Sequence, residues 1–155
     1  MGDRYDVAPH HLLRAALDDR FVRDLLARVG TPADELRLTL EQRWLEAAVV
    51  VGPEEVAALG IELDLVLGVL NPPVDHDPPW GGRHLTQPAR EVLIHALWER
   101  SLAPARRAHA GHLLLGLMAS RDRLVRSVFD DHGLQARDLR PLVAAWGRRA
   151  GDGAG

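Results

Sequence analysis

The sequence predicts an all-α protein, and three observations indicate this class. Apolar residues recur at intervals of three and four, most clearly at positions 21, 22, 25, 26 and 29, which is the spacing of one helical face. Aspartate or threonine precedes several such segments and glycine follows them, as expected at helix ends. The β-branched run at 49–51 has no partner strand elsewhere in the sequence, so we interpret it as the buried end of a helix.

The second half of the chain repeats the pattern of the first half. Residues 10–17 and 111–118 each place a histidine, His11 or His112, at the front of an apolar helical segment. Matching residues follow in both copies: Phe21-Val22-Arg23 with Leu124-Val125-Arg126, Gly30 with Gly133, and Leu36-Arg37 with Leu139-Arg140. The offset is about a hundred residues and shifts by two at one turn, which indicates an internal duplication.

In the first half we expect residues 1–8 to fray, because they are short and polar. Helices are predicted at 9–17 and 20–29; Asp18 or Asp19 caps the second, and Gly30 ends it. Thr31 as N-cap and Pro32 at the first position predict a third helix to about residue 51. Shorter helices are expected at 54–59 and 61–70.

The second half is predicted to start after a linker at 71–84, which is dense in proline and glycine. Thr86 is the expected N-cap of a helix to about residue 102, with Ser101 facing inward. Further helices are expected at 109–119, at 123–131 between Asp122 and Gly133, and at 136–149. The glycine-rich residues 150–155 are expected to form a disordered tail.

Composition predicts one soluble domain over residues 1–155 and excludes several classes of function. The net charge of −3 does not favour nucleic acid as a partner, and no apolar run is long enough for a membrane helix. The chain has no cysteine, and all 19 basic residues are arginine, so thiol, Schiff-base and P-loop lysine chemistry are excluded. No serine lies in a Gly-x-Ser-x-Gly turn. We therefore expect a cytoplasmic protein without catalytic residues or cofactors.

The histidines raise the question of a metal site. His109 and His112 could share a helix face, and residues 75–77 read Asp-His-Asp, but neither group supplies a fixed third ligand. We therefore expect no metal site. His11 and His112 stand at matching helix starts, where an imidazole can bond to the backbone, and we interpret both as structural.

Residues 85–93, Leu-Thr-Gln-Pro-Ala-Arg-Glu-Val-Leu, and residues 111–117, Gly-His-Leu-Leu-Leu-Gly-Leu, resemble the Clp N-terminal repeat (Clp R) domain, which precedes the motors of the ClpA and ClpC unfoldases. Residues 56–64 also resemble a Leu-Gly-Ile-x-Leu-Asp phrase of that family. The resemblance implies two degenerate four-helix repeats in a pseudo-two-fold bundle. Residues 9–70 would form the first repeat, which lacks its first helix, and residues 85–149 the second.

The resemblance also implies a non-enzymatic peptide- or protein-binding module that acts as an adaptor, competitor or decoy in Clp-dependent proteolysis. Family members bind peptides, adaptors and some cyclic-peptide antibiotics near the start of the first helix of each repeat. The matching residues here are Leu85, Thr86, Arg90 and Glu91. Expected partners are Clp unfoldase components, adaptors or peptides, with a cyclic-peptide antibiotic as a further candidate. A missing helix would leave an apolar face uncovered, which favours a homo-oligomer.

The chain departs from the family pattern at positions that bear on the ligand. In ClpC relatives a glutamate before the histidine of each repeat binds phosphoarginine, and His10 and Gly111 stand at these places. Leu85 replaces an aromatic residue and Arg90 a lysine. Because an arginine derivative needs a carboxylate partner, phosphoarginine binding is not expected.

An alternative function is that of a small helical DNA-binding regulator. Its surface would contain the arginines between Arg100 and Arg126, namely Arg100, Arg106, Arg107, Arg121, Arg123 and Arg126. Neighbouring aspartates weaken that cluster, so a solvated helix face is the preferred interpretation. Of the tryptophans, Trp44 and Trp146 are expected in the core, Trp98 at its edge, and Trp80 at a contact surface.

Overall fold

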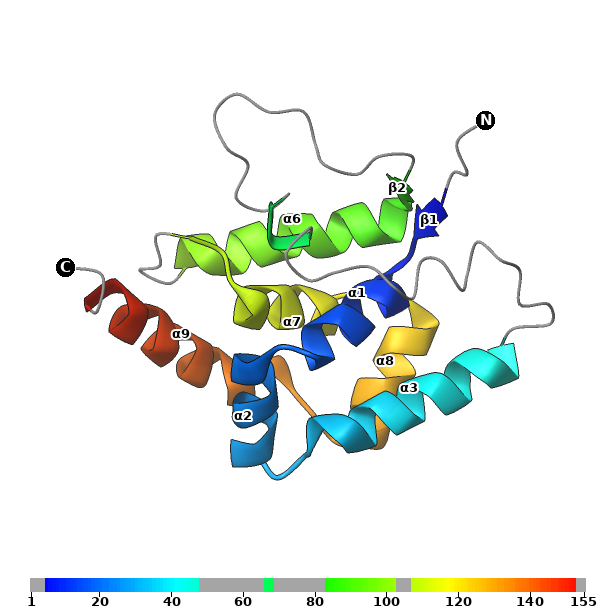
Figure 1. Cartoon of the computed structure of the whole chain (residues 1–155), viewed down its shortest axis with the longest axis horizontal. Coiled ribbons are helices and arrows are strands. Elements are labelled where there is room, and N and C mark those ends of the chain that lie inside the picture. The colour runs from blue at the N-terminus through cyan, green and yellow to red at the C-terminus, as the bar shows by residue number, and fades with distance from the viewer. Residues whose placement is uncertain (1–4, 48–65, 69–82, 103–106, 153–155) are drawn as a thin grey trace.

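The described part of the chain is mostly helical, as the sequence predicts. A computed structural model describes residues 5–47, 66–68, 83–102 and 107–152 (Figure 1). In chain order the elements are β1 (Tyr5–Val7), α1 (Pro9–Leu17), α2 (Arg20–Arg28), α3 (Ala33–Ala47), β2 (Arg83–Leu85), α6 (Gln87–Leu102), α7 (Ala110–Met118), α8 (Arg123–Asp131) and α9 (Ala136–Asp152). Residues 66–68 are also helical. The remainder of the helices expected at 54–59 and 61–70, most of the linker, Trp80 and Arg106 lie outside the described residues.

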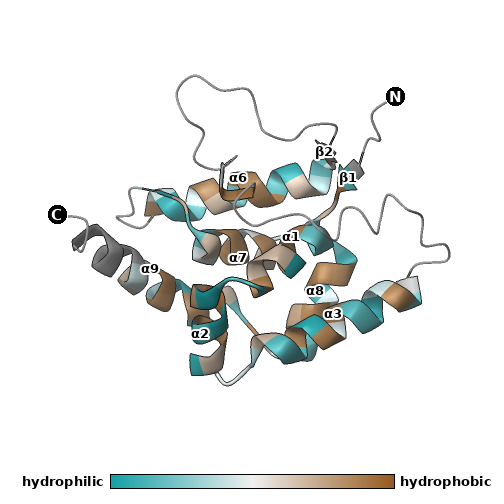
Figure 2. Ribbon diagram, viewed as in Figure 1, coloured by the Kyte–Doolittle hydropathy of each residue, from teal (hydrophilic) through white to brown (hydrophobic). Residues whose placement is uncertain are grey.

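Helix α7 lies at the centre of the molecule. It packs against α6, α1, α2, α8 and α9, and Figure 1 shows α6 along one side of it and α1 along another. Every residue of α7 except Met118 is buried. By contrast, hydrophilic and hydrophobic residues alternate along α2, α3 and α6, which each have an exposed side (Figure 2). Within the described residues, no helix combines the length and apolar character needed to cross a membrane.

Helices α6 and α7 approach one another closely at Gly116. A Cβ on Gly116 would lie 2.5 Å from the carbonyl oxygen of Val92 and 2.9 Å from the amide nitrogen of Ala96, both of α6. Glycine is therefore required at this contact, because backbone atoms cannot give way as a flexible side chain can. Helix α6 is also bonded to α9, since the buried carboxylate of Glu99 accepts two hydrogen bonds from the Arg140 guanidinium, at 2.8 and 3.0 Å.

The expectation that residues 1–8 fray is wrong for residues 5–7. These residues form β1, which pairs in parallel with β2, and Val7 lies opposite Leu85. Val7 is 0% exposed, and its carbonyl oxygen accepts a further hydrogen bond from the amide of Thr86 at 3.0 Å. The strands are three residues long and carry no alternating pattern, so sequence periodicity could not reveal them. Residues 83 and 84, predicted as linker, belong to β2.

Most helix ends follow the sequence prediction. Asp19 and Asp122 accept hydrogen bonds from the amides of Val22 and Val125, both at 3.0 Å, as N-caps of α2 and α8. Gly30 and Gly133 end these two helices at φ +82° and +64°, where a side chain would be strained. The third helix begins one residue later than expected, at Ala33 and not at Pro32. The Pro32 carbonyl accepts its first hydrogen bonds.

Three further predictions need correction. Helix α9 continues to Asp152, so residues 150–152 belong to a helix and not to a disordered tail. Ser101 is exposed, and its hydroxyl donates to the Trp98 carbonyl one turn back. Trp146 is 37% exposed and Trp44 only half-buried, so neither belongs to the core.

Most contacts between helices are repeated when α1, α2 and α3 are exchanged for α7, α8 and α9, although the packing of α2 against α3 has no comparable counterpart between α8 and α9. Helix α1 packs against α3, and α7 packs against α9. Helix α2 packs against α7, and α8 packs against α1. Helix α3 packs against α8, and α9 packs against α2, whereas the contact of α1 with α7 maps onto itself.

Candidate functional site

The residues predicted to bind a peptide lie where β2 leads into α6. Leu85 is half-buried in β2, and the Thr86 hydroxyl accepts a hydrogen bond from the Ala89 amide at 3.2 Å as the N-cap of α6. Arg90 and Glu91 follow on the exposed side of the first turns. Leu85 and Thr86 thus have structural contacts within the chain, while Arg90 and Glu91 present their charges to solvent.

Helix α6 also presents an apolar stripe to solvent. Ile94, Trp98 and Leu102 recur every four residues and are each 60–63% exposed. Trp98, expected at the edge of the core, is therefore a surface residue. Figure 2 shows hydrophobic stretches along α6.

His11 and His112 make the same bond at equivalent places. Nδ1 of His11 accepts from the Ala8 amide at 2.9 Å, and Nδ1 of His112 accepts from the His109 amide at 3.0 Å. Each imidazole thereby reaches back to the residue before its helix, as the glutamate of a capping box does. Both side chains are 1% exposed. This geometry supports the structural role predicted for both histidines.

Around His112 the second half has an aromatic cluster. The His109 ring lies 4.0 Å from that of His112 and 4.5 Å from that of Trp146, measured between centroids, and Phe21 lies 4.4 Å from Trp146. Burial lowers the pKa of His109 to about 3, with a smaller contribution from His112. Burial likewise lowers the pKa of His112 to about 4; Arg100 lowers it further, and Glu99 opposes the shift. Both rings are therefore neutral near pH 7.

The tautomer of these two rings follows from their hydrogen bonds. Nδ1 of His109 accepts from the Gly111 amide at 3.1 Å, so in both rings the proton of the neutral form lies on Nε2. Neither Nε2 has a hydrogen-bond partner among the described residues. The described part of the chain contains no group of three or more His, Asp or Glu side chains placed to hold a metal ion.

Gly111, the residue before His112, has closely packed surroundings. A Cβ at this position would lie 2.7 Å from His109 and 2.9 Å from Phe21. At the equivalent place in the first half, His10 lines a hollow of about 10 Å³ with Arg14, Arg37, Leu40, Glu41 and Trp44. Two arginines line this hollow with His10, so it would repel a guanidinium ligand.

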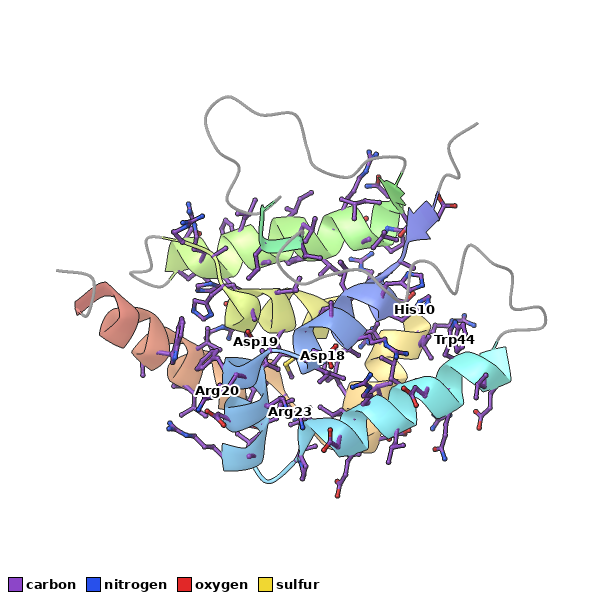
Figure 3. The ribbon with its side chains drawn as sticks, viewed as in Figure 1. His10, Asp18, Asp19, Arg20, Arg23 and Trp44 are labelled. Carbon is purple, nitrogen blue, oxygen red and sulfur yellow. The ribbon has the colours of Figure 1, made fainter. Side chains whose placement is uncertain are left out.

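An open groove of about 710 Å³ runs between α2 and α9, and we call it the α2/α9 groove. Its lining consists of an apolar floor and a charged rim: Asp19, Arg20, Phe21, Asp24, Leu25, Arg28, Leu142, Ala145 and Trp146. Figure 3 places Asp19 and Arg20 at the start of α2, with Arg20 on the side toward α9. The volume is in the range of sites that bind small molecules or peptide side chains.

The equivalent place in the other half, the α3/α8 interface, is closed by polar contacts. Arg43 donates from Nη2 and Nε to one oxygen of Asp131, at 2.6 and 3.2 Å. The Thr39 hydroxyl lies 2.8 Å from Nε2 of His132. The offset of 103 residues that relates Gly30 to Gly133 also relates Asp131 to Arg28 and Arg43 to Trp146. The groove thus has a cation and an indole where the other interface has an ion pair.

The arginines of the proposed DNA-binding surface divide between two places. Arg100 and Arg107 lie before α7, and Arg121, Arg123 and Arg126 lie after it. The nine residues of α7 span about 13 Å, so these two groups flank opposite ends of that helix.

Comparison with protein-family models, with curated proteins and with solved structures found no match to this chain. The resemblance to the Clp N-terminal repeat therefore depends on the residues of this sequence alone.

Sequence reasoning did not identify Phe21, Arg28 and Trp146 as site residues. Phe21 and Arg28 belong to an ordinary amphipathic helix, and Trp146 was assigned to the core. One available signal was the register of the duplication, because an offset of 103 places Arg43, and not Trp44, opposite Trp146. An exchange of a charged residue for an indole at equivalent positions indicates different surroundings.

Proposed function

We propose that this chain is a non-enzymatic protein-binding module related to the N-terminal domain of the Clp unfoldases. It is built from two degenerate Clp N repeats, of which the first lacks its first helix. It acts as an adaptor, competitor or decoy in Clp-dependent proteolysis. The observation that carries the binding role is the α2/α9 groove, which combines an apolar floor with an exposed charged rim.

The pairing of helices supports the relation to Clp repeats. Most contacts of α1, α2 and α3 recur for α7, α8 and α9, and both copies share a capping aspartate, a left-handed glycine and a histidine bonded to the residue before its helix. Helix α6 corresponds to the first helix of the second repeat, and in the first half β1 leads directly into α1. The exposed Arg90 and Glu91 belong to the binding surface that the resemblance implies.

The proposal is tested with a reconstituted Clp unfoldase, its peptidase and an adaptor-dependent substrate. Addition of the purified chain should slow degradation if it competes for adaptors or for the unfoldase, and accelerate it if it delivers substrate. The matched control is an unfoldase without its N-terminal domain, acting on a substrate that needs no adaptor, where the rate should not change. Unchanged rates in both assays, together with no calorimetric binding to unfoldase or adaptor, would contradict the proposal.

A further inference from the structure

The rim of the α2/α9 groove carries charges that have no ion-pair partner in the described part of the chain. Arg20, Asp24 and Arg28 are exposed and follow one another at intervals of four along α2. None of the three has an ion-pair partner among the described residues, whereas Arg23 of the same helix is paired with Asp34 at 3.0 Å. The two unpaired arginines are about 12 Å apart along the helix axis, since each residue rises about 1.5 Å.

The α3/α8 interface shows which chemical groups can pair at the position equivalent to the α2/α9 groove. There a guanidinium from one helix bonds to a carboxylate at the end of the other, in the contact between Arg43 and Asp131. In the groove the end of α2 supplies a guanidinium, Arg28, and α9 supplies Trp146 instead of a carboxylate. Arg28 has no ion-pair partner among the described residues, so its guanidinium can donate a charge-assisted hydrogen bond to a carboxylate of another molecule.

The floor of the groove is apolar and held in place. Leu25 is 2% exposed, and the Phe21 and Trp146 rings lie at 34° to one another with centroids 4.4 Å apart. Trp146 also contacts the His109 ring at 4.5 Å, and the Phe21 and His109 rings lie 5.4 Å apart, so the three rings form one cluster. Since Trp146 remains 37% exposed, its ring offers a preorganised apolar surface to a ligand side chain.

We propose that the α2/α9 groove binds an acidic amphipathic helix of a partner protein. Large apolar side chains of that helix lie on Phe21, Leu25 and Trp146, and two carboxylates eight residues apart pair with Arg20 and Arg28. Asp24, midway between the two arginines, selects a basic or amide side chain at the middle position of the ligand. The mode is that of a helix in a groove, with anchors every three or four residues. This inference rests on the proposed binding function and specifies the ligand of the same site.

The test uses two synthetic helical peptides with the same leucine stripe. One carries glutamates eight residues apart, and the other carries lysines at those places. Fluorescence anisotropy with the intact chain should show tighter binding of the glutamate peptide, with an affinity that falls as salt is added. The charge reversal Arg28→Asp should weaken binding of the glutamate peptide about fivefold, which corresponds to about 1 kcal/mol, and should favour the lysine peptide.

Two variants keep the result interpretable. Arg23→Asp changes the same charge on the same helix but outside the lining of the groove, and it should leave both affinities unchanged. Trp146→Ala should weaken both peptides alike, because it removes apolar surface and no charge. Melting curves of all variants establish that they are folded. Equal affinities for the two peptides, an unchanged preference in Arg28→Asp, or tighter binding of a DNA oligonucleotide than of the glutamate peptide would overturn the inference.

This experiment also separates the inference from the proposed function. If the chain alters Clp-dependent degradation and Arg28→Asp alters it equally, the Clp function stands and the groove assignment fails. If the peptides discriminate as expected but degradation is unaffected, the groove assignment stands and the Clp function fails.

Discussion

The two halves of the chain begin and end their helices in the same way but differ in how the last helix of each half meets its neighbour. Asp19 and Asp122 cap equivalent helices, and Gly30 and Gly133 end them. At the α3/α8 interface, side chains of the chain bond to one another across the contact. At the α2/α9 groove, the equivalent positions remain open to solvent.

This difference shows that a few side chains can convert a structural contact into a binding surface. The helix ends and the buried leucines, such as Leu36 and Leu139, are shared, so the backbone arrangement does not depend on the exchanged residues. Because exposed ion pairs contribute little to stability, the loss of one costs the fold little. The groove can therefore differ between copies without loss of the fold.

The two halves also differ in the close contact between α6 and α7, which belongs to the second half. Disruption of this contact gives the largest predicted loss of stability. Gly116→Ala places a methyl group 2.5 Å from the Val92 carbonyl, so α6 and α7 must separate. We expect a loss of about 2–3 kcal/mol in the free energy of unfolding, the upper range for overpacked cores. Urea unfolding followed by circular dichroism measures it.

The matched variant is Ala15→Gly, at the equivalent position of α1, where alanine is already present. It should cost about 1 kcal/mol, the usual propensity difference in a helix. If Gly116→Ala were no more costly than Ala15→Gly, the close contact between α6 and α7 would not be a requirement of the fold.

The hydrogen bonds that His11 and His112 accept at the start of their helices give the second-largest predicted effect on stability. His11→Ala and His112→Ala each remove a buried ring and the acceptor for an amide before the helix, and each should cost about 2 kcal/mol, as a lost cap together with a small cavity. Thermal unfolding measures both. Similar losses would support equivalent structural roles, whereas unchanged stability together with loss of a ligand would assign the histidine to binding.

In the second half, the stability that the buried histidines contribute should also depend on pH. The pKa values of His109 and His112 are lowered from 6.5 to about 3 and about 4 in the folded chain. The unfolded chain therefore binds more protons between about pH 4 and 6.5, and the free energy of unfolding should fall as the pH falls through that window. His112→Asn, which keeps an acceptor near Nδ1 but does not titrate, should reduce this slope.

The fold could be predicted largely from local signals. Capping aspartates, glycines after helices and apolar spacing act within a few residues, so α2, α8 and the start of α6 were placed correctly. The β1–β2 pair could not be predicted, because its three-residue strands are stabilised by a partner nearly eighty positions away. The groove could not be predicted either, because the sequence around Trp146 does not distinguish a ring buried in the core from a ring at the surface. Only its contacts with Phe21 and His109 distinguish the two.

The smallest predicted effect on stability comes from exchanging the two interfaces. In the double variant Arg43→Trp with Asp131→Arg, the α3/α8 interface receives the residues of the groove, and the exposed ion pair that it loses contributes little. The melting temperature should fall less than in Gly116→Ala, Ala15→Gly or the two histidine-to-alanine variants, as differential scanning calorimetry would measure. A titration with the glutamate peptide should show a second bound peptide per chain. If the double variant is instead destabilised as much as Gly116→Ala, the Arg43–Asp131 contact holds α3 on α8, and the two interfaces are not interchangeable.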